Sequence, residues 1–381
     1  ALNKELNSGK VARGSKEWDQ LQDKIRLVRK EIEKINSEQG ITKSKNLIGS
    51  VQVMLGNIYT KALSLLGSAL YDAVNKIRLF EKANVTLASI LGVNKKDVKD
   101  LSDSAISLSK SSQFAASQVT ELQTELAKLG FTKGEIKDVQ AHVLNFATAL
   151  EASLPDAAAL AGSSLRAFGA NSSESQRYMD AMTDAANKSA IGFEYLATAM
   201  PTVAPVAKAF NFSIEDTLAL LGKLSDSGFD ASTAATSLRN ILLNLADSNG
   251  KLAKALGKPV TNLDELVAGL QRLKDKGIDL ATALELTDQR SVAAFQTFLQ
   301  GSDTLLELRD SLKAAGGEAE RVAKDQMDNL DGSTKRLGAS WSALMLAFSN
   351  STGPMKKVVD GLTGIVNWVN KAVEASGRLQ D

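Results

Sequence analysis

Near the start of the chain, apolar residues recur at alternating intervals of three and four over residues 16–36. This spacing is typical of the a/d seam of a coiled coil and predicts a long helix within residues 1–40. Both a helical oligomer and a hairpin within one chain can use such a seam. Lys24 and Arg29 would face each other in a parallel homo-oligomer, which counts modestly against that form. The seam residues are Trp18, Leu21, Ile25, Val28, Ile32 and Ile35.

A second pattern, over residues 47–71, is an apolar run in which Lys61 is the only formally charged residue. The run is long enough to cross a bilayer, but glycines, serines and amides dilute it well below an ordinary transmembrane span. We therefore expect residues 41–89 to form an apolar helical segment that is buried against protein. Stable insertion into a membrane is the alternative.

From residue 90 onward, a helix-ending apolar residue is repeatedly followed by a glycine or asparagine and then by another apolar residue. The glycine or asparagine can adopt the left-handed conformation that ends many helices. These predicted corners are Gly92, Gly130, Gly169 and Asn211. Capping-box pairs follow three of them, namely Asn94 with Asp97, Thr132 with Glu135, and Ser213 with Asp216.

The four corners are separated by 38, 39 and 42 residues, which leaves room for two short helices in each interval. This period predicts stacked helical hairpins. The alternative is that the caps merely occur at irregular intervals, as they do in any helical protein. A fifth corner is predicted at Gly228, where one helix ends and Asp230 caps the next. We assign residues 90–315 to one helical domain.

The rest of the chain, residues 316–381, is predicted to form amphipathic helices. Gly316 and Gly317 are the best candidate for a hinge at its start. Gly353 and Pro354 separate an earlier helix from a later amphipathic stretch, residues 355–375.

Composition supports an all-α fold. Only 5% of the 381 residues are aromatic and five are proline, whereas alanine, leucine, serine and lysine are abundant. The expected architecture is an N-terminal coiled-coil-like helix followed by an array of short helices joined by Gly or Asn corners. Because the chain begins at Ala1 and stops without a clear domain ending, we expect it to be part of a longer protein.

The sequence contains no pattern that is typical of a reactive site. The chain has no cysteine and a single histidine, His142, so thiol chemistry and multi-histidine metal sites are excluded. It carries neither a phosphate-binding loop nor a hydrolase nucleophile motif. A net charge of +1 provides no large field for nucleic acid, and the pairs Lys95–Lys96 and Lys356–Lys357 are expected to be solvated. We therefore expect no enzyme activity, cofactor, metal or specific nucleic-acid binding.

Residues 180–242 closely resemble the core region of tail tape measure proteins from long-tailed bacteriophages and prophages. The likeness rests on "AANKSA" from Ala185, "APVAKAF" from Ala204, and the Gly228 corner followed by "TSLRNIL", in that order and spacing. Weaker likeness extends over residues 80–350 and includes "FGANSSESQRYMDAM".

The resemblance implies a structural virion protein that is made in the bacterial host cytoplasm and occupies the lumen of the tail tube. In that family the length of the protein sets the length of the tail, and the protein leaves ahead of the DNA at infection. The implied partners are copies of the same chain, the tail tube, tail-tip and tail assembly chaperone proteins, and transiently the host membrane.

Two other functions stay open at this point. A helical pore-forming or membrane-active protein is suggested by residues 47–71 and 355–375. A helical scaffold unrelated to phages is compatible with the composition alone.

Overall fold

The computed structural model describes residues 75–350, apart from 248–249 and 258–259, together with the single residues Asp23, Arg26 and Asp72. The chain divides into two compact units, Ala1–Asp72 and Ala73–Asp381, and the described helices belong to the second. The six residues of the predicted coiled-coil seam lie outside the described residues. The stretches 47–71 and 355–375 do so as well.

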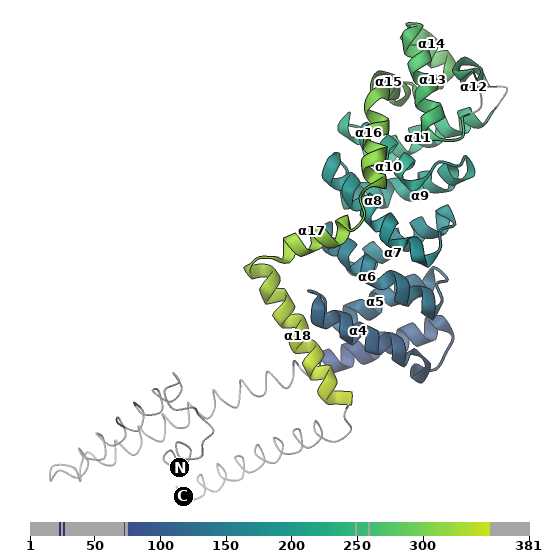
Figure 1. Cartoon of the computed structure of the whole chain (residues 1–381). Coiled ribbons are helices and arrows are strands. Elements are labelled where there is room, and N and C mark those ends of the chain that lie inside the picture. Colours follow the sequence, from purple (N-terminus) through teal and green to yellow (C-terminus); the bar gives the residue numbers. More distant parts are fainter. Residues whose placement is uncertain are drawn as a thin grey trace, which may run out of the picture. The chain divides into compact units, whose positions relative to one another are not determined.

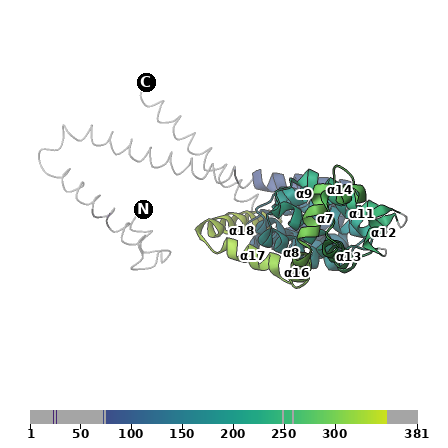
Figure 2. The ribbon, with the colours of Figure 1, turned by 90° about the horizontal axis from the view of Figure 1, so that it is seen from above.

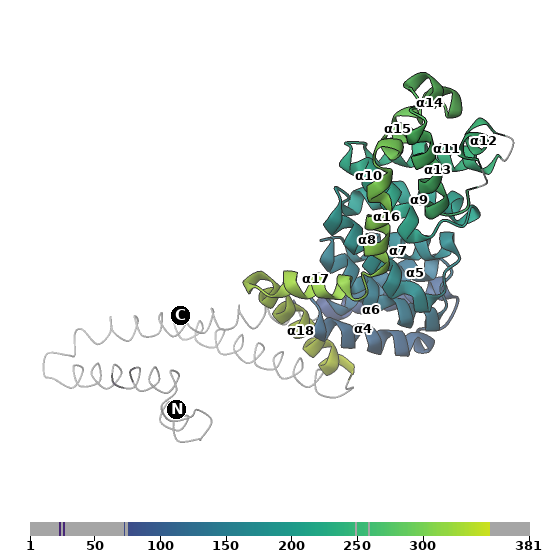
Figure 3. The same cartoon turned by 45° about the horizontal axis from the view of Figure 1, so that its top comes forward.

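The described residues form helices and no strands, which confirms the all-α prediction for this part of the chain. After the helical residues 75–91, eight helices alternate between two layers. The first layer contains α4 (Lys99–Ser111), α6 (Lys133–Ala149), α8 (Ser175–Lys188) and α10 (Ile214–Asp226). The second layer contains α5 (Ala116–Lys128), α7 (Leu154–Phe168), α9 (Phe193–Ala209) and α11 (Ala231–Ala246). Each helix packs on the next helix of its own layer, so that the hairpins stack (Figures 1 and 3).

The corners between helices have a common local structure. The five predicted corner residues all have positive φ, namely Gly92 at 67°, Gly130 at 79°, Gly169 at 64°, Asn211 at 60° and Gly228 at 85°. At each corner, the N–H of the next residue donates to a carbonyl five residues earlier, as in the bond of 3.1 Å from Phe131 to Leu126. This pairing satisfies carbonyls that would otherwise be orphaned at the helix end.

The predicted capping boxes at Thr132 and Ser213 are confirmed. The Thr132 Oγ1 accepts from the Glu135 N–H at 3.3 Å, and the Glu135 carboxylate accepts from the Thr132 N–H at 2.8 Å. The corresponding distances for Ser213 and Asp216 are 3.0 and 3.1 Å. Helices α6 and α10 therefore begin with N–H groups that are satisfied by their own local sequence.

Beyond α11, four short helices lie at the end of the stack: α12 (Lys251–Leu256), α13 (Leu263–Asp275), α14 (Leu280–Leu286) and α15 (Val292–Gln300). The chain then returns along the first layer through α16 (Ser302–Lys313), α17 (Glu318–Met327) and α18 (Leu330–Asn350). Helix α16 contacts α10 and α8, α17 contacts α8 and α6, and α18 contacts α4. Figure 2 shows α16, α17 and α18 along one side of the stack. We call these three the return helices.

The hydrophobic core is continuous through the stack, the end helices and the return helices. It includes Phe80 and Leu87 of the helical residues 75–91, which the sequence assigned to the apolar segment 41–89. It also includes Ala319 of α17 and Leu346 of α18, which the sequence assigned to the segment 316–381. The packing therefore does not break at residues 89 or 315, because the helices on either side of these positions share buried apolar surface.

Candidate functional site: the acidic face of the helix stack

Helices α8 and α10 carry four buried acidic side chains, three of which contact the return helices. Asp180, Asp184, Glu215 and Asp216 are between 1% and 5% exposed. A buried carboxylate costs several kcal/mol unless hydrogen bonds or opposite charges compensate it. We call these four residues the acidic face. Their partners on other helices show what this face does.

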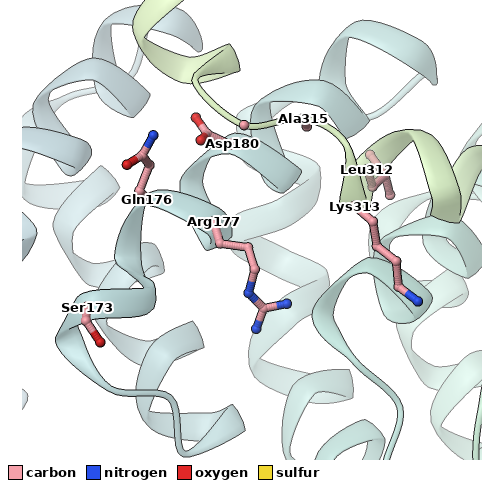
Figure 4. Close-up of a pocket in the computed structure, with 8 residues that line it drawn as sticks. Ser173, Gln176, Arg177, Asp180, Leu312, Lys313 and Ala315 are labelled. Atoms are coloured by element: carbon pink, nitrogen blue, oxygen red, sulfur yellow. The ribbon is translucent and has the colours of Figure 1, made fainter.

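Asp180 binds the start of α17. Its Oδ2 accepts from the Gly317 N–H at 2.7 Å and its Oδ1 accepts from the Ala319 N–H at 2.9 Å. The carboxylate therefore caps α17 from a helix that lies 137 residues earlier in the sequence, and its charge also complements the helix dipole. In Figure 4 the Asp180 carboxylate lies beside the connection that contains Ala315. The predicted hinge at Gly316 and Gly317 is thus tied to the stack at two backbone groups, with Gly317 at a φ of 83°.

Arg309 joins three elements at the middle of α16. Its Nη1 and Nη2 donate to the two carboxylate oxygens of Asp264 in α13 at 2.7 and 3.0 Å, and its Nε donates to Asp310 at 2.6 Å. Its Nη1 also lies 3.6 Å from Oδ1 of buried Asp216. Hydrogen bonding from Arg309 holds the pKa of Asp264 below its ordinary value. The same bonds, opposed by partial burial, raise the pKa of Arg309.

Arg177 compensates the charge of Glu215. Its Nη1 lies 2.5 Å from Oε1 of Glu215, and its Nη2 donates to Glu174 at 2.9 Å. Burial lowers the pKa of the guanidinium, but the attraction of the two carboxylates outweighs burial and the net shift is upward. These contacts link α8 to α10 within the first layer. Oε2 of Glu215 has no hydrogen-bond partner among the described residues.

At the end of α8, Asp184 accepts from the Ser311 Oγ of α16 at 3.1 Å and lies 3.0 Å from Nζ of Lys188. Lys188 also donates to Ser311. Asn187 donates to Glu318 at 2.9 Å, which brings α8 and α17 together. Each acidic residue of the face thus contributes to holding a return helix or a neighbouring helix of the stack.

A surface pocket of about 250 Å³ lies next to the acidic face (Figure 4). Ser173, Gln176, Arg177 and Asp180 line it from the stack, and the end of α16 and its following residues line it from the other side. Asp180 and Arg177 both have the partners described above, so this pocket offers no free pair of reactive groups.

His142, the only histidine, is half-buried on α6 and lines a small cavity with Asp180 and Glu320. The described residues contain no group of three or more His, Cys, Asp or Glu side chains placed to hold a metal ion. None of the described helices combines the length and the apolar character that a membrane span requires.

The sequence did not reveal the acidic face. Asp180 and Asp184 occur in an ordinary amphipathic helix, and the residues that bind them lie more than 120 positions later. The one available signal was the unusual position of several acids among the apolar residues of α8 and α10, as in "YMDAMTDAA" and "FSIEDTLALL".

Residues 102–324, from α4 into α17, match a protein family that is described as phage-related minor tail protein. The chain is 25% identical over 335 residues to the tape measure protein of Pneumococcus phage Dp-1. This alignment covers 84% of this chain and 29% of the phage protein. It is also 25% identical over 351 residues to a probable tape measure protein of Escherichia phage P2. This alignment covers 84% of this chain and 43% of the phage protein.

The chain therefore spans less than half the length of either relative. No solved structure matches it significantly. The matched region contains both layers of the stack, the end helices and the acidic face with most of its partners. Because this match covers more than half of the 381 residues, the chain belongs to the phage-related minor tail protein family.

Proposed function

We propose that the chain is a folded structural module of a tail tape measure protein. The observation that carries this proposal is the agreement between the fold and the family match, since the match over residues 102–324 contains nearly all of the helix stack together with the end helices and α16. The two tape measure relatives support the same role. Neither comparison favours the pore-forming or the non-viral scaffold alternative.

The fold determines how much length such a module could contribute to the tail. A continuous helix advances about 1.5 Å per residue, so 381 residues would span roughly 570 Å. A stacked hairpin of about 39 residues advances only one helix spacing, about 10 Å, or roughly 0.25 Å per residue. The folded stack is therefore about six times shorter than the same sequence as one helix. We infer that the stack adds little to the ruler and that other parts of the full-length protein provide most of its length.

As part of this proposal, the protein is made in the host cytoplasm and lies in the lumen of the tail tube. Its partners are copies of itself and the tail tube, tail-tip and tail assembly chaperone proteins, with transient contact with the host membrane after ejection. It has no catalytic role and binds no specific nucleic-acid sequence. The acidic face supports a structural role because its charged groups are engaged in holding helices together.

Tail length provides the test. A second copy of residues 94–246, about 150 residues that form four hairpins, is inserted in frame into the phage gene at residue 246. Tails longer by roughly 40 Å are expected if the added hairpins stay folded, and by roughly 230 Å if they extend into one helix. Electron microscopy of purified virions measures both outcomes. An insertion of the same length outside the tail genes is the control.

Unchanged tail length in virions that contain the enlarged protein would contradict the tape measure proposal. Mass spectrometry of the same virions establishes that the enlarged chain is present. A lengthening of roughly 230 Å would keep the tape measure role but overturn the inference that the stack remains folded in the tail.

A further inference from the structure

Helix α18 has two apolar faces, of which one is buried against the stack and the other is exposed. Ala339, Ser342, Ala343 and Leu346 are buried, in keeping with the contact of α18 with α4. On the opposite face, Leu330 is 84%, Leu337 70%, Trp341 47% and Leu344 45% exposed. We call these four residues the outer stripe.

The outer stripe has the spacing of a helix-pairing seam. Its members are separated by seven, four and three residues, and at about 100° per residue they lie within roughly 60° of one line along the helix. Scattered exposed apolar residues are normal on protein surfaces, but several large ones aligned along one face of a helix mark a contact surface. The stripe therefore fits a second amphipathic helix.

The sequence that follows α18 has a matching pattern. Over residues 355–375, apolar residues recur at intervals of three and four. They are Met355, Val358, Leu362, Ile365 and Val369. This stretch has 21 residues and so does α18, which gives each a helical length of about 31 Å.

The connection between the two stretches is short. Only residues 351–354 separate Asn350 from Met355, and they include Gly353 and Pro354, which end helices. Two helices joined by two to five residues form an antiparallel hairpin. In such a hairpin Trp341 would lie level with Leu362 and Ile365, and Leu337 would lie level with Ile365 and Val369.

We propose that residues 355–375 fold back as a helix onto the outer stripe of α18 and form a hairpin with it. A second copy of the chain is the competing occupant of the stripe. A short tether gives an effective concentration on the order of millimolar, so the attached segment occupies the stripe before a second copy at micromolar concentration can. This inference is independent of the tape measure proposal.

Disulfide crosslinking tests the hairpin in the full 381-residue chain, which has no cysteine of its own. Leu337→Cys is combined in turn with one cysteine at each of positions 364–371, and the purified proteins are oxidised mildly. Crosslinks within one chain are expected to peak every three to four positions and to be unchanged over a tenfold range of protein concentration. Lys335→Cys is the matched control, because Lys335 is exposed but lies about 160° around the helix from Leu337.

Thiol labelling of the single-cysteine variants provides a second measurement. Leu337→Cys is expected to react at least tenfold more slowly than Lys335→Cys. Equal labelling rates would overturn the proposal, as would crosslinking that is absent or evenly spread over the scanned positions. Concentration-dependent dimers of Leu337→Cys would instead assign the stripe to a second copy and would overturn the hairpin.

Discussion

Replacement of Asp180 tests whether the acidic face holds the return helices. Asp180→Ala removes the acceptor of two short hydrogen bonds, of 2.7 and 2.9 Å, from the N–H groups of Gly317 and Ala319. A hydrogen bond to a charged group contributes about 1.5–3 kcal/mol, and a buried donor left without its acceptor costs about 1–3 kcal/mol. Because two such bonds are lost, we expect Asp180→Ala to lower the free energy of unfolding by about 3–5 kcal/mol. Asp180→Asn keeps one carbonyl acceptor and should lose about half as much.

The matched control is Ser153→Ala at the exposed N-cap of α7, where the Ser153 Oγ accepts from the Asp156 N–H at 3.3 Å. Loss of an ordinary N-cap costs about 1 kcal/mol. Urea unfolding followed by circular dichroism gives the three free energies. Hydrogen exchange should also become faster in residues 317–327 for Asp180→Ala and not for Ser153→Ala. If the two alanine variants lose equal stability, or if exchange in α17 is unchanged, Asp180 does not anchor the return helices.

Three further predictions concern a corner glycine, a glycine within α18 and two tyrosines. Gly228→Val should destabilise the chain by about 1 kcal/mol or more because of the positive φ, since a Cβ at this position meets no atom within 4 Å. Gly338→Ala, in the open middle of α18, should instead stabilise it by up to about 1 kcal/mol in the same thermal melts. Burial raises the pKa of Tyr178 and of Tyr195 to about 12, from 10.0. Because the folded pKa exceeds the unfolded value, the stability that these groups provide is present below pH 10 and is lost as the pH rises toward 12. Urea titrations at pH 9 and 11 should show a smaller loss for the double variant Tyr178→Phe, Tyr195→Phe, and an unchanged loss would contradict this assignment.

The hairpin stack could be predicted from the sequence because its determinants are local. A glycine or asparagine with positive φ, a helix-ending apolar residue and a capping pair all lie within about seven residues of one another, as at Gly130 and Thr132. Their recurrence at intervals of about 40 residues then indicates which helices form hairpins. Asn211 shows that the signal does not need glycine, since an asparagine tolerates the left-handed conformation at modest cost.

The acidic face could not be predicted because its determinants are distant in the sequence. Asp180 and Gly317 acquire their roles only when α16 and α17 return along the stack, and no local spacing encodes that return. The same holds for Arg309, whose partners Asp216 and Asp264 belong to different helices. Gly317 was recognised as a break in the helical pattern, but its anchoring to α8 depends on tertiary packing.

The return helices change how the stack can come apart. In a simple stack each hairpin contacts only its neighbours, so stability is nearly a sum of local terms and unfolding can begin anywhere. Here α16 contacts both α8 and α10, and α17 contacts both α6 and α8, so each of these two return helices bridges two hairpins. Detachment of α17 would break the two hydrogen bonds to the Asp180 carboxylate, so the loss of this return helix removes contacts of α8 within the stack. The polar contacts of the acidic face therefore couple hairpins that a simple stack would leave independent. A module built this way should unfold as one cooperative unit while its return helices are attached, and hairpin by hairpin once they are removed.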